Sequence, residues 1–313
     1  KRAGHQQYSE HHQENLPARP QGCTAFAVPA RFIVDVRPCS HEEMVSCDIT
    51  LQPKARGLSL GGGPLPLLGD PAHEEMVQSL RSVAARIERP EAIIVVSAHW
   101  EERVATITSA ANPGIIYDYY GFPPESYEIR YPAPGSPDLA SRLQSRLQDG
   151  GIKAMLDGDR GFDHGLYIPL KIMYPEADIP CVQWSLLDSL DPSAHIALGE
   201  AMSGIAGSGT LVIGSGFSFH ILKAFFSKDA SKPDARNEAF ERWLVETCSN
   251  RELDEPGRAR RLIAWETAPH ARYCHPREEH LLPLHVCYGV TGRPAEAVVE
   301  LSILNKMASL YLW

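Results

Sequence analysis

A run of apolar residues, many of them β-branched, forms the most regular extended pattern of the chain. It covers residues 92–98 and ends at His99 and Trp100. Such a run is typical of a strand that is buried on both faces of an α/β sheet. Because ligands and metals in open α/β folds lie at the carboxyl ends of the strands, His99 is a candidate metal ligand or general base. A half-buried histidine that only caps a strand explains the same pattern equally well.

Helical and extended patterns alternate along the rest of the chain. Asp70 and Pro71 predict the start of a helix whose apolar residues recur at helical spacing as far as Ile87. Ser136 and Asp191 predict the starts of two further helices. The remaining predicted elements are helices around residues 240–248 and 258–265 and strands around residues 104–108, 179–186, 210–213, 298–304 and 310–313.

This alternation, without an internal repeat, predicts a single α/β domain with a central mixed β-sheet flanked by helices. We expect the domain to cover residues 57–313. Residues 1–56 differ, because His5, His11 and His12 lie among polar residues in a composition that cannot bury much apolar area. We predict a poorly structured or atypical N-terminal segment here, in which residues 32–36 could form a strand.

Composition limits the partners of the protein. The chain has 313 residues and a formal net charge of -9, which argues against binding to nucleic acid or to an anionic membrane surface. No apolar segment approaches the roughly 20 residues of a membrane span. The seven cysteines are scattered without a Cys-x-x-Cys pair, which fits a reducing compartment and predicts a cytoplasmic protein.

An aromatic and proline-rich region follows the strand predicted around residues 104–108. Its tyrosines and phenylalanine are Tyr117, Tyr119, Tyr120, Phe122, Tyr127 and Tyr131. A packed Ω-loop and the wall of a site for a planar ligand explain this composition equally well.

Several histidines stand in short motifs beside an apolar element. They are His99 after a strand, His164 in Asp-His-Gly, His220 after a Gly-Ser-Gly turn, His275 in His-Pro and His280 in Glu-Glu-His. Several such residues together predict a mononuclear metal site at the strand ends, with additional histidines for proton transfer.

Other chemistries find less support in the sequence. Ser97 and Ser218 lie in no Gly-x-Ser-x-Gly motif, and the chain has no His-Glu-x-x-His zinc motif. The turn from Gly214 to Gly216 lacks the third glycine of a dinucleotide-binding loop. A zinc hydrolase is therefore a distant alternative.

Four motifs occur in order along the chain: Ser97-Ala-His99-Trp100, Asp163-His164-Gly165, Gly214-Ser-Gly216-x-Ser-x-His220 and His275-Pro-x-x-Glu279-His280-x-x-Pro-Leu284. Together they resemble the motifs of class III extradiol ring-cleavage dioxygenases, and in particular those of the 4,5-DOPA dioxygenase-like group. The block Gly-Gly-Gly-Pro64-Leu-Pro-Leu-Leu-Gly-Asp70 is similar to the N-terminal motif of that group. The resemblance extends from about Gly57 to Trp313.

This resemblance implies a non-haem Fe(II), or alternatively Zn(II), held on a single α/β domain. His99 and His280 would be metal ligands, and His164 would be the acid/base residue or an additional ligand. His220 would bind substrate, and His275 would contact substrate or the oxygen at the metal as a catalytic residue. The implied reaction opens the ring of a small, DOPA-like catechol with O2 to a muconate semialdehyde. Neutral imidazoles suit this reaction because they leave coordination positions open, and a nearby histidine can transfer the catechol proton.

One position departs from the family pattern. The first ligand of the family is a histidine in a Ser-His-Gly motif, whereas this chain has Ser59-Leu60-Gly61. Leucine has no lone pair for a metal, so we expect weaker Fe(II) binding and impaired activity unless His41 or His73 substitutes. An altered N-terminal segment would also explain Leu60. The second hypothesis is therefore a non-catalytic, metal-poor binding protein on the same scaffold.

Overall fold

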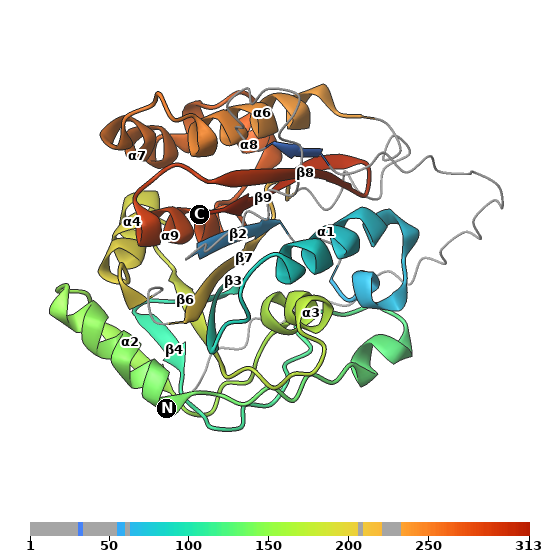
Figure 1. Ribbon diagram of the computed structural model, residues 1–313, viewed down its shortest axis with the longest axis vertical. Helices are drawn as coiled ribbons and strands as arrows, with labels where there is room; N and C mark the ends of the chain where they lie inside the picture. Colours follow the sequence, from blue (N-terminus) through green and yellow to red (C-terminus); the bar gives the residue numbers. More distant parts are fainter. Residues whose placement is uncertain (1–30, 34–54, 60–62, 206–208, 221–232) are drawn as a thin grey trace, which may run out of the picture.

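The computed structural model describes residues 31–33, 55–59, 63–205, 209–220 and 233–313. Nine strands in these ranges form one mixed sheet in the order β1-β8-β9-β2-β7-β3-β6-β4-β5 (Figure 1). In chain order the strands are β1 (Arg31–Ile33), β2 (Ala55–Ser59), β3 (Ala92–Glu102), β4 (Ala105–Thr108), β5 (Ala154–Asp157), β6 (Cys181–Leu187), β7 (Thr210–Gly216), β8 (Ala297–Ile303) and β9 (Lys306–Leu312). The predicted α/β fold with a mixed central sheet is confirmed.

The predicted strand of residues 92–98 lies inside this sheet as part of β3, between β7 and β6. Both neighbours run parallel to it, and Val95 pairs with Ile213 on β7 and with Gln183 on β6. Ile93 and Val95 pack into the core on one face of the sheet, whereas Ile94 and Val96 pack into the core on the other. A strand covered on both faces needs apolar residues at every position, which explains the continuous run.

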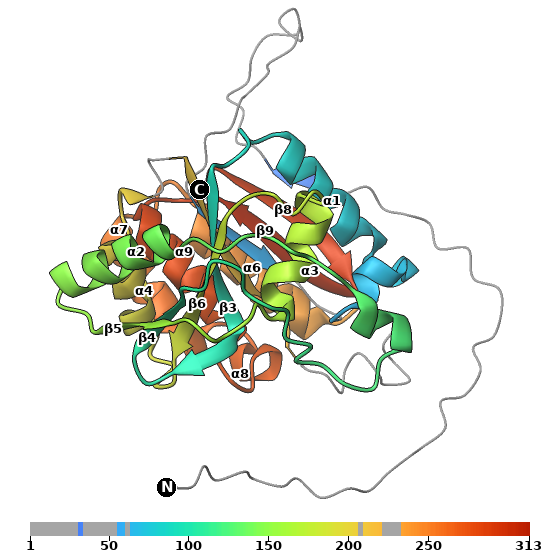
Figure 2. The same cartoon turned by 90° about the horizontal axis from the view of Figure 1, so that it is seen from below.

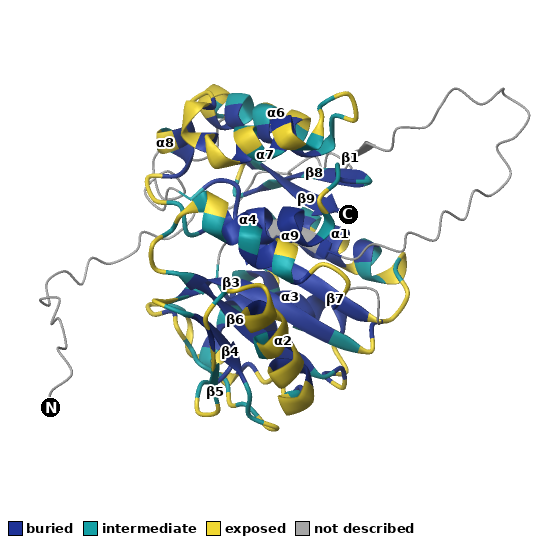
Figure 3. Cartoon of the chain, turned by 90° about the vertical axis from the view of Figure 1, so that its left-hand side faces the viewer, coloured by how far each residue is buried: buried dark blue, intermediate teal, exposed yellow. Residues whose placement is uncertain are grey.

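Helices cover both faces of the sheet. In chain order they are α1 (Glu74–Ala85), α2 (Pro137–Asp149), α3 (His164–Met173), α4 (Pro192–Ala201), α6 (Ala235–Ser249), α7 (Glu255–Ile263), α8 (Ala271–Cys274) and α9 (Leu282–Thr291). The apolar residues of α1 and α3 join one core, and those of α2, α4, α6, α7 and α9 join the other (Figure 2). Figure 3 shows the central strands buried between these layers, with exposed residues on the outer helices.

Two of the predicted helix starts have the expected cap. The hydroxyl of Ser136 accepts a hydrogen bond from the backbone N–H of Leu139, and the carboxylate of Asp191 accepts one from Ser193. The helix expected at Pro71 begins later, at Glu74. Residues 71–73 form a short 3-10 turn, and the Asp70 carboxylate accepts from the ring of His73 at 2.7 Å instead of from the backbone.

Several elements were not predicted from the sequence, among them the helices α3 and α8 and the strands β2 and β5. Helix α3 was missed because Pro169 lies inside it, yet Asp163 caps its first turn by accepting from the N–H of Gly165. Strand β2 crosses residue 57 and pairs with β7 and β9. Of the strand predicted at residues 32–36, the structure places Arg31–Ile33 as β1 against β8, and residues 34–36 lie outside the described part.

Two further observations concern the described residues. None of their helices is both long enough and apolar enough to span a bilayer. The cysteines in these ranges are buried thiols, namely Cys181, Cys248, Cys274 and Cys287.

Candidate metal centre

His99 lies near the carboxyl end of β3, where the pairing of this strand with β6 is irregular. Val96 pairs with Trp184, and the next pair joins Glu101 to Leu186. The residues between Val96 and Glu101 therefore bulge out of the regular ladder. Bulges of this kind redirect side chains and occur frequently beside active sites.

Four histidine rings meet at this end of the sheet, and we call them the four-histidine cluster. The ring centroid of His99 lies 3.9 Å from that of His164 and 4.9 Å from that of His280. The ring of His220 stacks on His280 at 3.5 Å. The structure thus brings together four of the five histidines that the sequence singled out. They come from β3, from the first turn of α3, from the segment after β7 and from the turn before α9.

A carboxylate contacts each of the two partly exposed rings, His164 and His220, which we call the outer rings; His99 and His280 are the inner rings. Asp118 Oδ1 lies 2.8 Å from Nδ1 of His164, and the backbone N–H of His164 donates to the same oxygen. Glu279 Oε1 lies 3.3 Å from Nδ1 of His220. A carboxylate accepts the Nδ1 proton, which leaves the Nε2 lone pair of the ring available to a metal or a substrate.

The surroundings of the two inner rings, half-buried His99 and buried His280, favour their neutral form. Burial, followed by the neighbouring ring of His164, lowers the pKa of His99 to about 3. Burial also lowers the pKa of His280 well below its ordinary value, with His220 and His99 acting in the same direction. Neutral imidazole is the form of histidine that binds metals.

The carboxylates beside the outer rings remain charged. Burial alone would raise the pKa of Asp118, but its hydrogen bond to His164 and the proximity of the His164 and His99 rings lower it overall. The pKa of Glu279 is lowered in the same way, with His220 opposing the effect of burial.

The donor atoms of the cluster fit a divalent transition metal. Those of His99, Asp118 and His164 all lie within 4.8 Å of one another, and so do those of His220, Glu279 and His280. Nδ1 of His280 is buried without a hydrogen-bond partner, which is an unusual state for a polar atom in a protein interior. Imidazole nitrogen with carboxylate oxygen suits iron and zinc, so each of the two groups is a candidate metal site. His99 and His280, the ligands that the resemblance implies, fall in different groups.

His275 lies apart from the four-histidine cluster. It is fully buried, packs against Phe240 and Trp265, and its Nε2 donates to the carbonyl oxygen of Ser218 at 2.9 Å. Burial lowers the pKa of His275 to about 3. The His275 ring therefore contacts the backbone of the segment that carries His220 and stabilises that segment.

The Asp-His-Gly motif has a structural explanation. Asp163 is fully buried, accepts hydrogen bonds from the Ser97 hydroxyl at 2.9 Å and from Gly165 at 3.0 Å, and pairs with Arg160 at 3.1 Å. A Cβ at position 165 would lie 2.5 Å from the Ser97 oxygen and 3.1 Å from the His99 ring. The motif therefore joins the start of α3 to β3 and places His164 against His99.

The aromatic region is a packed loop, and its second explanation, the wall of a site for a planar ligand, stays a prediction. Several of its rings pack edge to face, and the Tyr119 and Tyr117 hydroxyls donate to the carbonyls of Ser126 and Ile129, respectively. Tyr119 also lies 5.7 Å from His164, ring centroid to ring centroid. The loop is thus a packed unit that contributes one face to the cluster.

Two residues of the site were not predicted. Asp118 was read only as part of an aromatic composition, and nothing in its local pattern connects it to His164. Glu279 precedes His280 inside a motif that the sequence did single out, so adjacency could have identified it. Leu60 and His41 lie outside the described residues, and His73 lies at the start of α1 beside Asp70.

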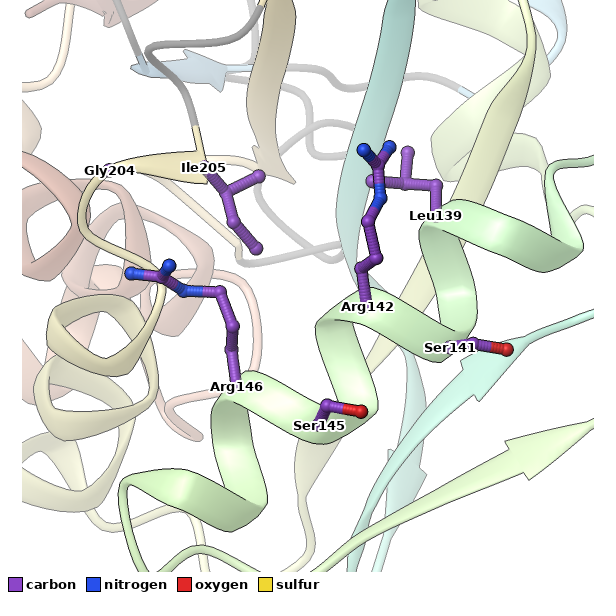
Figure 4. A pocket seen from close by; sticks show the side chains of 7 residues that line it. All are labelled: Leu139, Ser141, Arg142, Ser145, Arg146, Gly204 and Ile205. Atoms are coloured by element: carbon purple, nitrogen blue, oxygen red, sulfur yellow. The ribbon is translucent and has the colours of Figure 1, made fainter.

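A pocket of about 490 Å³ lies away from the cluster, between α2 and the turn after α4, and Arg142 and Arg146 extend into it (Figure 4). A neighbouring pocket shares Arg142 and reaches Ala92 and Thr210, which begin β3 and β7. These pockets therefore lie at the opposite ends of the strands. Guanidinium groups have no lone pair for a cation, and no histidine, cysteine or carboxylate of the described residues lines the first pocket, so that pocket does not compete as a metal centre.

The fold and the cluster define an α/β protein with a candidate mononuclear metal centre of imidazole donors at its strand ends. Comparison with known families matches residues 65–308 to the catalytic LigB subunit of aromatic ring-opening dioxygenase. The chain therefore belongs to the LigB family, the class III extradiol dioxygenases.

Individual relatives agree with this membership. The chain is 41% identical to dioxygenase tasH of Hapsidospora irregularis, over 74% of this chain and 76% of that protein. It is 39% identical to 4,5-DOPA dioxygenase extradiol of Beta vulgaris, over 67% of this chain and 76% of that one. A crystal structure of the uncharacterized protein JW3007 from Escherichia coli K12 superposes with a TM-score of 0.66 at 28% identity, covering 82% of this chain and 98% of that one.

Proposed function

We propose that this protein is a non-haem metal-dependent extradiol dioxygenase that opens the ring of a small, DOPA-like catechol with O2 to a muconate semialdehyde. The observation that carries the proposal is the four-histidine cluster, whose two inner imidazoles are neutral, at the strand ends of a LigB-family chain. Relatives named 4,5-DOPA dioxygenase extradiol support the substrate class. On this proposal the catalytic domain covers residues 57–313.

His99 and His280 are the proposed metal ligands, with His164 as an additional ligand or the acid/base residue. We propose Fe(II), with Zn(II) as the alternative, because imidazole donors suit both. Bound Fe(II) would supply adjacent open positions for a catecholate and dioxygen and would move electron density between them.

His164 is the proposed proton carrier. Its Nδ1 proton is held by Asp118 at 2.8 Å, so its Nε2 can accept the proton of a catechol hydroxyl. The carboxylate of Asp118 would then stabilise the charged ring until the proton returns to an oxygen of the ring-opened product.

His220 is the proposed substrate-binding residue, because its ring is partly exposed beside His280 and is oriented by Glu279. We propose an indirect role for His275, because its buried ring bonds the backbone of Ser218, in the segment that carries His220. The planar catechol would lie against Tyr119, whose ring already borders His164.

The test is anaerobic reconstitution of the protein with Fe(II), followed by oxygen uptake and formation of a yellow product across a panel of small catechols. We expect turnover with DOPA-like catechols. Absence of turnover across the panel, in protein shown to be loaded with metal, would contradict the proposal.

Leu60 favours the second candidate, a non-catalytic, metal-poor binding protein on the same scaffold. This candidate predicts little iron or zinc in the purified protein by elemental analysis. A stoichiometric metal would contradict it.

The substitution Leu60→His tests the identity of the missing ligand. If position 60 corresponds to the first family ligand, the added imidazole should raise both Fe(II) affinity and ring cleavage. Fe(II) titration and oxygen uptake measure the two effects. If neither rises, position 60 is not the place of the lost ligand.

A further inference from the structure

Arg277 lies in the turn between α8 and α9 and bridges two acidic residues beside the four-histidine cluster. Its guanidinium donates to both carboxylate oxygens of Glu101, at 2.5 and 2.6 Å. Nη1 of the same guanidinium lies 3.4 Å from Oε2 of Glu279. Because two parallel hydrogen bonds to Glu101 fix the plane of the guanidinium, Arg277 faces Glu279 in a defined orientation.

Glu279 uses its two carboxylate oxygens for different partners. Oε1 lies 3.3 Å from Nδ1 of His220, whose ring stacks on His280. Oε2 is buried and has no hydrogen bond of ordinary geometry within the part of the chain that the structure describes, and the guanidinium of Arg277 is its cationic neighbour. A buried carboxylate oxygen without its cationic partner is costly, so loss of Arg277 should turn the carboxylate and disturb its contact with His220.

Glu101 connects this bridge to the strand that carries His99. It lies two residues after His99 on β3, where regular pairing with β6 resumes opposite Leu186. The contact between Glu101 and Arg277 spans 176 residues of the chain and joins β3 to the turn that carries His280. The bridge therefore links the two elements that hold the proposed metal ligands, whose ring centroids lie 4.9 Å apart.

The exposure of the bridge sets the size of its effect. The side chain of Arg277 is 50% exposed and that of Glu101 is 25% exposed, whereas that of Glu279 is 14% exposed. Exposed ion pairs contribute little to the stability of a whole protein. We therefore expect the bridge to act locally, on the carboxylate of Glu279 and the ring of His220, and not on global unfolding.

We propose that Arg277 is a positioning residue of the active site, which holds the Glu279 carboxylate against His220 and is itself held by Glu101. The proposal rests on the proposed function, in which His220 binds substrate. Arg277 acts through Glu279 and does not touch the substrate. Its loss should therefore weaken substrate binding more than it slows ring opening.

Steady-state kinetics of three variants of the full chain test this role. Arg277→Gln removes the charge, whereas Arg277→Lys keeps the charge and loses the two-bond contact. Arg261→Gln is the matched control, because the Arg261 guanidinium forms the same two-bond contact with Glu246, at 3.1 and 3.3 Å, between α7 and α6. In Fe(II)-loaded protein, Arg277→Gln should raise the KM for the catechol about fivefold, the upper range for an exposed ion pair, and change kcat less. The KM of Arg277→Lys should lie between those of Arg277→Gln and the wild type.

A second readout does not depend on turnover. In metal-free protein, the nuclear Overhauser effect between the ring protons of His220 and His280, which stack at 3.5 Å, should weaken in Arg277→Gln and persist in Arg261→Gln. If it weakens as expected but metal-loaded wild-type protein turns over no catechol, the proposed function fails and the positioning role stands. If the KM and this ring contact in Arg277→Gln match those of Arg261→Gln, the positioning role is wrong. Glu101→Gln provides the same test if Arg277→Gln does not fold.

Discussion

At the scale of single residues, two different surroundings prepare the histidines of the cluster. His99 and His280 are held neutral mainly by burial, whereas the carboxylates of Asp118 and Glu279 support the two outer rings. The sequence could identify the histidines, because their motifs are local. It could not identify Asp118, since this residue meets His164 only through the fold.

Asp118→Asn should lower kcat and Fe(II) affinity by about 10- to 100-fold, because an orienting carboxylate fixes both the tautomer and the basicity of its histidine. Steady-state kinetics and metal titration measure the two effects. Asp178→Asn is the control, since Asp178 pairs with Arg89 on the exposed surface. Equal behaviour of the two variants would show that Asp118 does not orient His164.

At the scale of elements, close contact between the start of α3 and β3 builds the site. Pro169 obscured this helix in the sequence, because proline inside a helix is disfavoured. Asp163 nevertheless caps the helix, and Gly165 leaves room for the Ser97 hydroxyl. The identity of each residue was visible in the sequence, but their spatial relation was not.

Gly165→Ala should destabilise the protein by about 1–3 kcal/mol, because the added Cβ overlaps the Ser97 oxygen and crowds His99. Urea unfolding measures the change. Gly158→Ala is the control, since the nearest atom to a Cβ there is Ser109 Oγ at 3.8 Å. A loss no larger than that of Gly158→Ala would contradict the close contact between α3 and β3.

At the scale of the whole molecule, the apolar pattern was sufficient to predict an α/β sheet with β3 in its interior. The order of the nine strands could not be predicted from this pattern, because strands such as β2 and β7 lie far apart in the chain and meet only in the sheet. The irregular pairing beside His99 depends on two strands at once, so it could not be predicted from the sequence either.

Buried neutral histidines should make the metal-free protein sensitive to acid. The pKa of His275 is about 3 and that of His195 is about 4 in the folded state, both below the value of about 6.5 in an unfolded chain. The unfolded state therefore binds more protons, and stability should fall as the pH drops below about 6.5, by up to about 1.4 kcal/mol per pH unit and histidine. Urea unfolding at a series of pH values measures this slope. Stability that does not change between pH 7 and 5 would contradict neutral burial.

The central claim is that the four-histidine cluster, loaded with metal, adds both atoms of dioxygen to a catechol ring. Mass spectrometry of the product formed by Fe(II)-loaded protein under isotopically heavy dioxygen tests it most directly, with borohydride trapping to prevent exchange of the aldehyde oxygen. We predict one ring-opened product that carries both labelled atoms, and its loss in His99→Ala and His280→Ala. A product with one labelled atom or none, or the same labelled product from both variants, would contradict the claim.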